Sequence, residues 1–190
     1  MKRTLISAAL ALGLSTAAHA APDNYSIDPS HTFSHWSLSH LGFSMQQGRF
    51  NSTSGKITLD MAAKSGSADI SIDASSIDSG WAKRDEHLRG EDFFNTAKYP
   101  TLNFKSSKFQ FKGDKLVAVD GQLTLLGVSK PVKLNVSHFH CGIHPMIPNK
   151  QWCGAAASTS IKRSDFGMSK YLPGVGDDVQ IVIQVEAGKD

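Results

Sequence analysis

The stretch TFSHWSLSH, residues 32–40, decides the fold because two large apolar side chains recur at every second position. In an extended chain, every second side chain points to the same face of a sheet. One face of this stretch therefore carries, in order, Thr32, Ser34, Trp36, Leu38 and His40. Alternation of this kind predicts a half-buried antiparallel strand.

The same period of two recurs about eight times along the chain. Later stretches with this pattern centre on Ile57–Leu59, Ile70–Ile72, Leu102–Phe111, Leu116–Leu125, Val132–Val136, Ala155–Ile161 and Val179–Val185. Closing such strands into a barrel removes the exposed edges of an open sheet. The sequence therefore predicts an all-β protein with an eight-stranded antiparallel barrel, whose interior has room for packed side chains or for one small ligand.

One segment breaks the alternation. Between Ser79 and Asn95, apolar residues lie among charged ones, and residues 83–89 form a polar run that suits a helix. We therefore predict a short helix between the third and fourth strands that leans on the barrel.

The beginning of the chain resembles an export signal. Lys2 and Arg3 precede an apolar run, Leu5–Leu14, and residues 18–20 (Ala-His-Ala) follow, with a small residue on each side of the histidine. This order is typical of a secretory signal peptide, so we expect residues 1–20 to be removed and residues 21–190 to form a single exported domain. No later segment reaches the ~20 apolar residues that a transmembrane helix needs.

Charge gives little reason to expect a nucleic-acid partner. The formal net charge is +3, and removing Lys2 and Arg3 with the signal leaves +1. No basic run follows that could track phosphates.

Cys141 and Cys153 are the only cysteines, and both lie in the exported part. In an oxidising compartment they are expected to form a disulfide, which would contribute roughly 3 kcal/mol. The alternative function is metal binding, because His138 and His140 share a strand face and could hold zinc or copper with His144 if the loop folded back. A disulfide weakens this alternative because it removes both thiolates.

Catalysis has no visible nucleophile in this sequence. There is no Gly-x-Ser-x-Gly elbow, no His-Glu-x-x-His and no glycine-rich phosphate loop. In the predicted helix, Asp85, Glu86 and His87 are consecutive and point about 100° apart, so they cannot converge on one substrate atom. We therefore expect a binding protein and not an enzyme.

Several motifs together resemble the YceI-like family over residues 25–187. They are Asp28-Pro29-Ser30-His31, His40-Leu41-Gly42, Gly48-Arg49-Phe50, Arg84-Asp85-Glu86-His87-Leu88-Arg89, Asp92-Phe93-Phe94, the stretch Gly121–Val132, Asp165-Phe166-Gly167-Met168 and Gly176-Asp177-Asp178-Val179. The insertion at 138–154 resembles a cysteine-bridged subset of the family.

The resemblance implies a lipocalin-like barrel in the periplasm that holds a polyisoprenoid chain, such as a quinone tail or a prenyl lipid, in an elongated cavity. No cofactor beyond that lipid is implied. The alternating apolar residues would equally fill a solid core, so only the resemblance favours a hollow barrel. If it is hollow, the lining is expected to include Trp36, Leu38, His40, Leu59, Ile72, Phe104, Leu123, Leu125, Leu134, Val136 and Ile183.

The polar helix offers candidates for the ligand's head group. Arg84, His87 and Arg89 could meet a pyrophosphate or a carbonyl if the polar end emerges there. A purely structural role, in which Asp85 pairs with one of the arginines, is the stronger expectation. Apolar rim residues such as Phe43 and Trp81 would be exposed at an open mouth, and a homodimer is one arrangement that would cover them.

Overall fold

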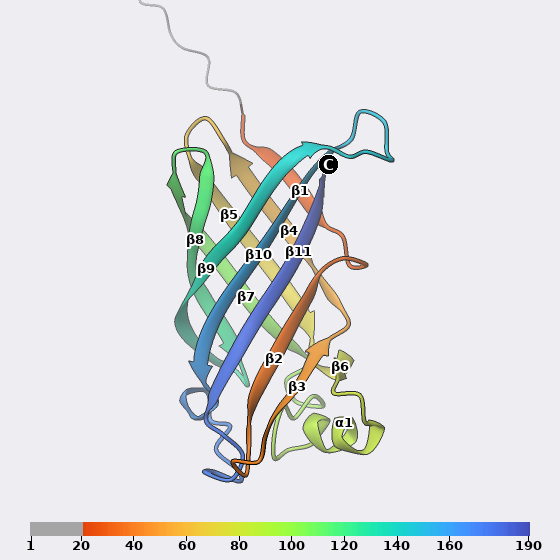
Figure 1. The fold of residues 1–190 in the computed structure, drawn as a ribbon, viewed down its shortest axis with the longest axis vertical. Coiled ribbons are helices and arrows are strands. Elements are labelled where there is room, and N and C mark those ends of the chain that lie inside the picture. Colours follow the sequence, from red (N-terminus) through yellow and green to blue (C-terminus); the bar gives the residue numbers. More distant parts are fainter. Residues whose placement is uncertain (1–20) are drawn as a thin grey trace, which may run out of the picture.

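The computed structural model describes residues 21–190, which form one antiparallel sheet that closes on itself (Figure 1). The ring closes because β1 pairs with β4 on one side and with β11 on the other. Its eight strands are β1 (Asp23–Ile27), β4 (Thr53–Asp60), β5 (Ser65–Asp73), β7 (Thr101–Lys112), β8 (Lys115–Leu125), β9 (Val128–Ile143), β10 (Gln151–Lys162) and β11 (Asp178–Lys189).

The barrel opens toward one end, where three further strands extend its wall. β2 (Phe33–His40) continues from β1 after a corner at residues 28–32, and both strands pair with β11. β3 (Ser44–Phe50) pairs with β2 and with the two-residue β6 (Ile77–Asp78). One long, bent edge of the barrel is therefore shared between β1 and β2.

The only α-helix of the described chain, α1 (Ala82–Arg89), lies at this end beside β3 and β6 (Figure 1). Two short 3₁₀ helices accompany it, at Ala74–Ser76 and Arg163–Phe166. The strand ring and the helix between the third and fourth predicted strands, β5 and β7, confirm the predicted fold. β1, β3 and the two-residue β6 were not predicted. β3 has the sequence SMQQGRF, which lacks the alternation of apolar residues on which the prediction rests.

Buried side chains form two clusters inside the barrel. The first lies toward α1 and includes Phe50, Phe93 and Phe166, and the second lies toward the opposite end and includes Tyr25 and Leu59. Within residues 21–190, no helix is long and apolar enough to cross a lipid bilayer. The predicted signal peptide, residues 1–20, lies outside the described residues.

Candidate functional site

The barrel is hollow. A cavity of about 900 Å³ opens beside α1, where His87 and Tyr171 line it, and reaches Tyr25 and Cys153 in the second buried cluster. This volume lies toward the upper end of the range of about 300–1,000 Å³ that is common for small-molecule sites. The side chains therefore leave room for a ligand of considerable length along the barrel.

The wall of the cavity is almost entirely apolar, as the period of two requires. Every residue expected to line a hollow barrel lines this cavity: Trp36, Leu38, His40, Leu59, Ile72, Phe104, Leu123, Leu125, Leu134, Val136 and Ile183. His40 is exposed at the mouth of the cavity, where its backbone forms an isolated antiparallel β-bridge with Val175. An interior of this kind favours apolar chains over polar metabolites, because it offers few hydrogen bonds to replace those with water.

Polar residues gather at the mouth. The Tyr171 hydroxyl donates a 2.6 Å hydrogen bond to Asp92, and the His87 ring nitrogen Nε2 lies 3.5 Å from the same carboxylate. The bond from Tyr171 lowers the pKa of Asp92 below its ordinary value, while Asp92 raises the pKa of Tyr171. The Tyr171 ring also stacks on Phe93, with 5.8 Å between ring centroids. The mouth thus combines aromatic faces with hydrogen-bonding groups.

The three head-group candidates on α1 have different surroundings. Arg84 and His87 line the cavity, and Arg84 donates to Ser79 and Gln46. Arg89 does not line it; its guanidinium donates to the carbonyls of Ser75 and Ile77 and so fixes α1 to the preceding segment. Only Arg84 and His87 remain as candidates at the mouth.

The predicted pairing of Asp85 with an arginine is not what the structure shows. Asp85 is 7% exposed and accepts hydrogen bonds from the backbone N–H and the hydroxyl of Ser79. The carboxylate therefore holds the chain that enters the helix.

Arg163 is a buried cation that the sequence did not single out. It is 2% exposed and lines the cavity. Its guanidinium donates to four backbone carbonyls, those of Gly176, Met168, Lys170 and Val175, at 2.8–2.9 Å. Burial lowers the pKa of Arg163, and the negative charge of Asp177 partly offsets this. These bonds hold the 168–176 segment, which forms one side of the mouth.

Cys141 and Cys153 form a disulfide, as predicted, between directly paired positions of β9 and β10. His138 and His140 are both exposed on β9 and, as expected, share a face, which is the outer one. His144 instead accepts hydrogen bonds at Nδ1 from the backbone N–H groups of Met146 and Ile147, and its ring packs against Trp152. These three histidines do not form a metal-ligating cluster in the described part of the chain.

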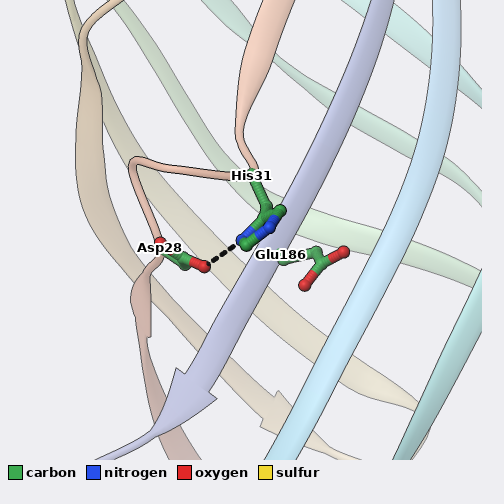
Figure 2. A group of neighbouring side chains, drawn as sticks. All are labelled: Asp28, His31 and Glu186. Carbon is green, nitrogen blue, oxygen red and sulfur yellow. Dashed lines mark hydrogen bonds and ion pairs between the residues drawn. The ribbon is translucent and has the colours of Figure 1, made fainter.

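A different trio of potential ligands lies on the outer surface, at the corner between β1 and β2 (Figure 2). Asp28, His31 and Glu186 each place one ligand atom within 4.8 Å of the others. The His31 ring nitrogen Nδ1 lies 2.7 Å from Asp28, and Glu186 accepts a hydrogen bond from the Trp152 indole. The first contact lies within the corner and the second joins β11 to β10, so both carboxylates and the imidazole already have partners in the protein.

Sequence reasoning missed Thr53, Arg163 and Tyr171, which all line the cavity. Thr53 had a usable signal, because extending the period of two back from Leu59 and Ile57 puts it on the inner face of β4. Arg163 had the same signal, because it continues the period of two from Thr159 and Ile161 on β10, whereas Tyr171 lies in an irregular segment where no period applies.

Together, the closed strand ring and its long apolar interior define a β-barrel with an internal ligand cavity. A model of the YceI-like domain matches residues 25–187. The chain therefore belongs to the YceI-like family.

Known proteins of similar sequence and fold agree with this assignment. A UPF0312 protein of Pseudomonas aeruginosa is 36% identical over 98% of this chain and 97% of its own length. The crystal structure of the Campylobacter jejuni YCEI protein aligns with a TM-score of 0.68 and 30% identity, over 80% of this chain and 90% of that one. A polyisoprenoid binding domain from Saccharophagus degradans shares the fold, with a TM-score of 0.63 and 20% identity over 87% and 98% of the two chains.

Proposed function

We propose that this protein is a carrier that binds one long isoprenoid lipid, a quinone or a prenyl chain, inside the barrel. The observation that carries the proposal is the apolar cavity of about 900 Å³, which runs from the mouth beside α1 to the second buried cluster. Burying a CH₂ group contributes about 0.8 kcal/mol, so a chain of several isoprene units gains enough from burial to remain bound in water.

The structural neighbour from Saccharophagus degradans supports the ligand class, since it is described as a polyisoprenoid binding domain. The cavity itself supports binding more than catalysis. Its wall is apolar, and the polar groups at the mouth, Tyr171, Asp92 and His87, contact one another. We infer that the protein holds its lipid without altering it.

We place this carrier in the periplasm. The support is the order of residues 1–20, which is typical of a secretory signal, together with the disulfide between Cys141 and Cys153. An apolar lipid that crosses an aqueous compartment needs a protein that covers its chain, and the barrel wall provides such a cover.

The polar end of the lipid belongs at the mouth if that end is charged. Arg84 lines the cavity there, beside the exposed His87. A phosphate at this position would keep contact with water and gain charge-assisted hydrogen bonds. The apolar tail would then extend past Trp36 and Phe104 toward the second buried cluster.

Two neighbouring alanines on β10 allow a direct test. Ala157 is 7% exposed and lines the cavity, whereas Ala156 is not part of the lining. Ala157→Phe places a ring inside the cavity, and we expect it to weaken binding of a long-chain ubiquinone at least tenfold, measured by calorimetric titration. Ala156→Phe adds the same ring to the same strand and should bind like the wild type.

Thermal unfolding of both variants separates loss of the cavity from loss of the fold. If Ala157→Phe is unfolded, Ala155→Phe, at a less buried cavity position, takes its place. A folded cavity variant that binds the quinone as tightly as the wild type would contradict the proposal.

A further inference from the structure

Two buried polar atoms in the described chain have no hydrogen-bond partner, and both belong to residues that line the cavity. They are the hydroxyl oxygen Oγ1 of Thr53 and the indole nitrogen Nε1 of Trp36. Thr53 is only 3% exposed. Most buried polar groups in proteins are hydrogen-bonded, so two orphaned groups in the wall of one cavity require an explanation.

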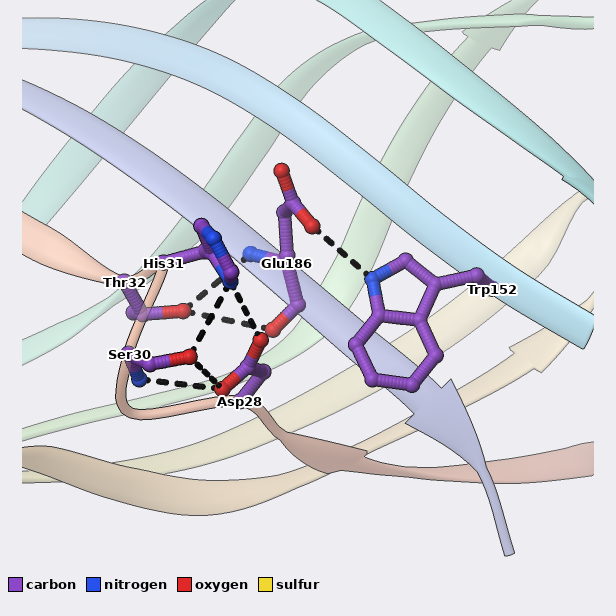
Figure 3. A network of polar contacts seen from close by, with 6 residues as sticks. All are labelled: Asp28, Ser30, His31, Thr32, Trp152 and Glu186. Carbon is purple, nitrogen blue, oxygen red and sulfur yellow. Dashed lines mark hydrogen bonds and ion pairs between the residues drawn. The ribbon is translucent and has the colours of Figure 1, made fainter. Parts of the chain in front are cut away.

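A second threonine shows what a satisfied hydroxyl looks like in this barrel (Figure 3). Thr32 is also 3% exposed, and its hydroxyl donates to the carbonyl of Glu186 at 3.2 Å and accepts from the N–H of Glu186 at 3.1 Å. The hydroxyl of Thr32 thus links the corner to β11 through two hydrogen bonds. Thr53 is buried to the same extent, but its hydroxyl has no hydrogen-bond partner.

The two orphaned groups border the same part of the barrel. Trp36 is paired with Gly48 on β3, and Thr53 opens β4 just after β3 ends. Trp36 packs against the first buried cluster, and the strand partner of Thr53, Ile72, belongs to that cluster. Both residues therefore line the half of the cavity toward α1, inside the mouth, with their polar atoms covered by neighbouring side chains in this structure.

Their chemistry determines what could satisfy them. An indole N–H can only donate, and a threonine hydroxyl can donate as well as accept. The missing partner is therefore an acceptor. It is also a neutral one, because a buried anion needs a paired cation, and the buried cation of the lining, Arg163, already uses four of its five N–H donors on backbone carbonyls.

We propose that Thr53 and Trp36 form a polar site inside the apolar cavity that donates hydrogen bonds to a neutral carbonyl oxygen of the lipid, as on a quinone ring. The proposal rests on the proposed carrier function and narrows its ligand class. It selects isoprenoid lipids with a neutral carbonyl head that enters the barrel, over isoprenoid phosphates whose charged end stays at the mouth.

The test compares two probes, a ubiquinone and squalene, which is an isoprenoid hydrocarbon without oxygen. Thr53→Val keeps the volume of the side chain and removes the hydroxyl. We expect it to weaken ubiquinone binding roughly 5- to 10-fold and to leave squalene binding unchanged, since one hydrogen bond is lost with one probe only. Trp36→Phe should likewise lower the ratio of the affinity for ubiquinone to the affinity for squalene.

Thr32→Val is the matched control, because it removes a hydroxyl that is already satisfied within the protein. It should lower the unfolding temperature and leave the ratio of the two affinities as in the wild type. An infrared measurement adds a direct signature: the carbonyl stretch of bound ¹³C-labelled quinone should lie at lower frequency in the wild type than in Thr53→Val.

The outcomes separate this inference from the function on which it rests. If the wild type binds both probes and the ratio is unchanged in Thr53→Val and in Trp36→Phe, the polar site is refuted and the carrier function stands. If the wild type binds neither probe, both are refuted. Should Thr53→Val fail to fold, Trp36→Phe and the infrared signature decide the same question.

Discussion

The indole of Trp36 lies across Gly48, its partner on the neighbouring strand β3. A Cβ atom on Gly48 would come within 2.5 Å of Trp36 Cζ2 and 2.6 Å of the carbonyl oxygen of Asp78. The glycine therefore gives the largest side chain of the β2 inner face its place in the cavity wall.

Gly48→Ala should destabilise the protein by about 1–3 kcal/mol, because neither the ring nor the backbone oxygen can move away cheaply. Chemical denaturation measures the loss, and near-ultraviolet circular dichroism reports the displaced indole. Gly154→Ala is the control, since a Cβ there meets its nearest atom at an ordinary 3.6 Å. Equal stabilities of the two variants would show that Gly48 has no such role.

The disulfide between Cys141 and Cys153 should stabilise the fold and be dispensable for binding. Replacing both cysteines with alanine is expected to cost about 2–4 kcal/mol in the free energy of unfolding. Of the two cysteines only Cys153 lines the cavity, at its end opposite α1, so affinity for the lipid should change less than about twofold at a temperature where the variant is folded. A large loss of affinity in the folded variant would assign the bridge a part in binding.

Replacing Arg163 should destabilise the fold even when the new residue is lysine. An ammonium group cannot reach the four carbonyls that the planar guanidinium serves, and each buried carbonyl left without a partner costs about 1–3 kcal/mol. We expect Arg163→Lys to lose at least about 3 kcal/mol of stability. The adjacent Lys162→Met, which removes a half-exposed ion pair with Asp178, should lose less than about 1 kcal/mol. Similar losses in the two variants would argue against the role of Arg163 in holding the 168–176 segment.

The contact between Asp28 and His31 predicts a pH window. The hydrogen bond to Asp28 raises the pKa of His31 above 6.5. The contribution of His31 to the stability of the fold is therefore complete below pH 6.5 and is lost as the pH rises through the raised pKa. Burial raises the pKa of Asp28, but hydrogen bonds from Ser30 and His31 outweigh it and bring the pKa below 3.8. The contribution from Asp28 is therefore present above 3.8 and is lost as the pH falls through the lowered pKa.

The contact should accordingly stabilise the fold most between about pH 4 and 6.5. Urea unfolding of the wild type and of His31→Gln, each at about pH 5 and about pH 8.5, measures this. We expect the difference between the two proteins to be larger at the lower pH. A difference that is the same at both values would exclude the ionic contribution.

Much of the barrel could be predicted from sequence because a period of two specifies which side chains face inward. Trp36, Leu123 and Ile183 come from different strands, yet each is placed in the lining by its own strand's alternation. The hollow interior could not be predicted in this way. Whether such residues meet in the middle or leave a cavity depends on the curvature of the whole sheet, which no single strand records.

The polar groups were harder to predict because their partners come from distant segments. Arg89 was expected near a head group, yet its partners are the carbonyls of Ser75 and Ile77, on the segment before α1. Thr32 and Thr53 are the same residue type at inward positions. Only the approach of β11 to the corner distinguishes the satisfied hydroxyl from the orphaned one.

Mass spectrometry of the lipid extracted from the purified full chain tests the carrier function most directly. The protein is expressed in a bacterium that makes isoprenoid quinones, purified without detergent and extracted with organic solvent, with Ala157→Phe treated in parallel. We predict an isoprenoid lipid, about one per barrel, in the wild-type extract and a strongly reduced amount in the variant. The absence of any isoprenoid from the wild type, together with no uptake of added quinone, would contradict the account.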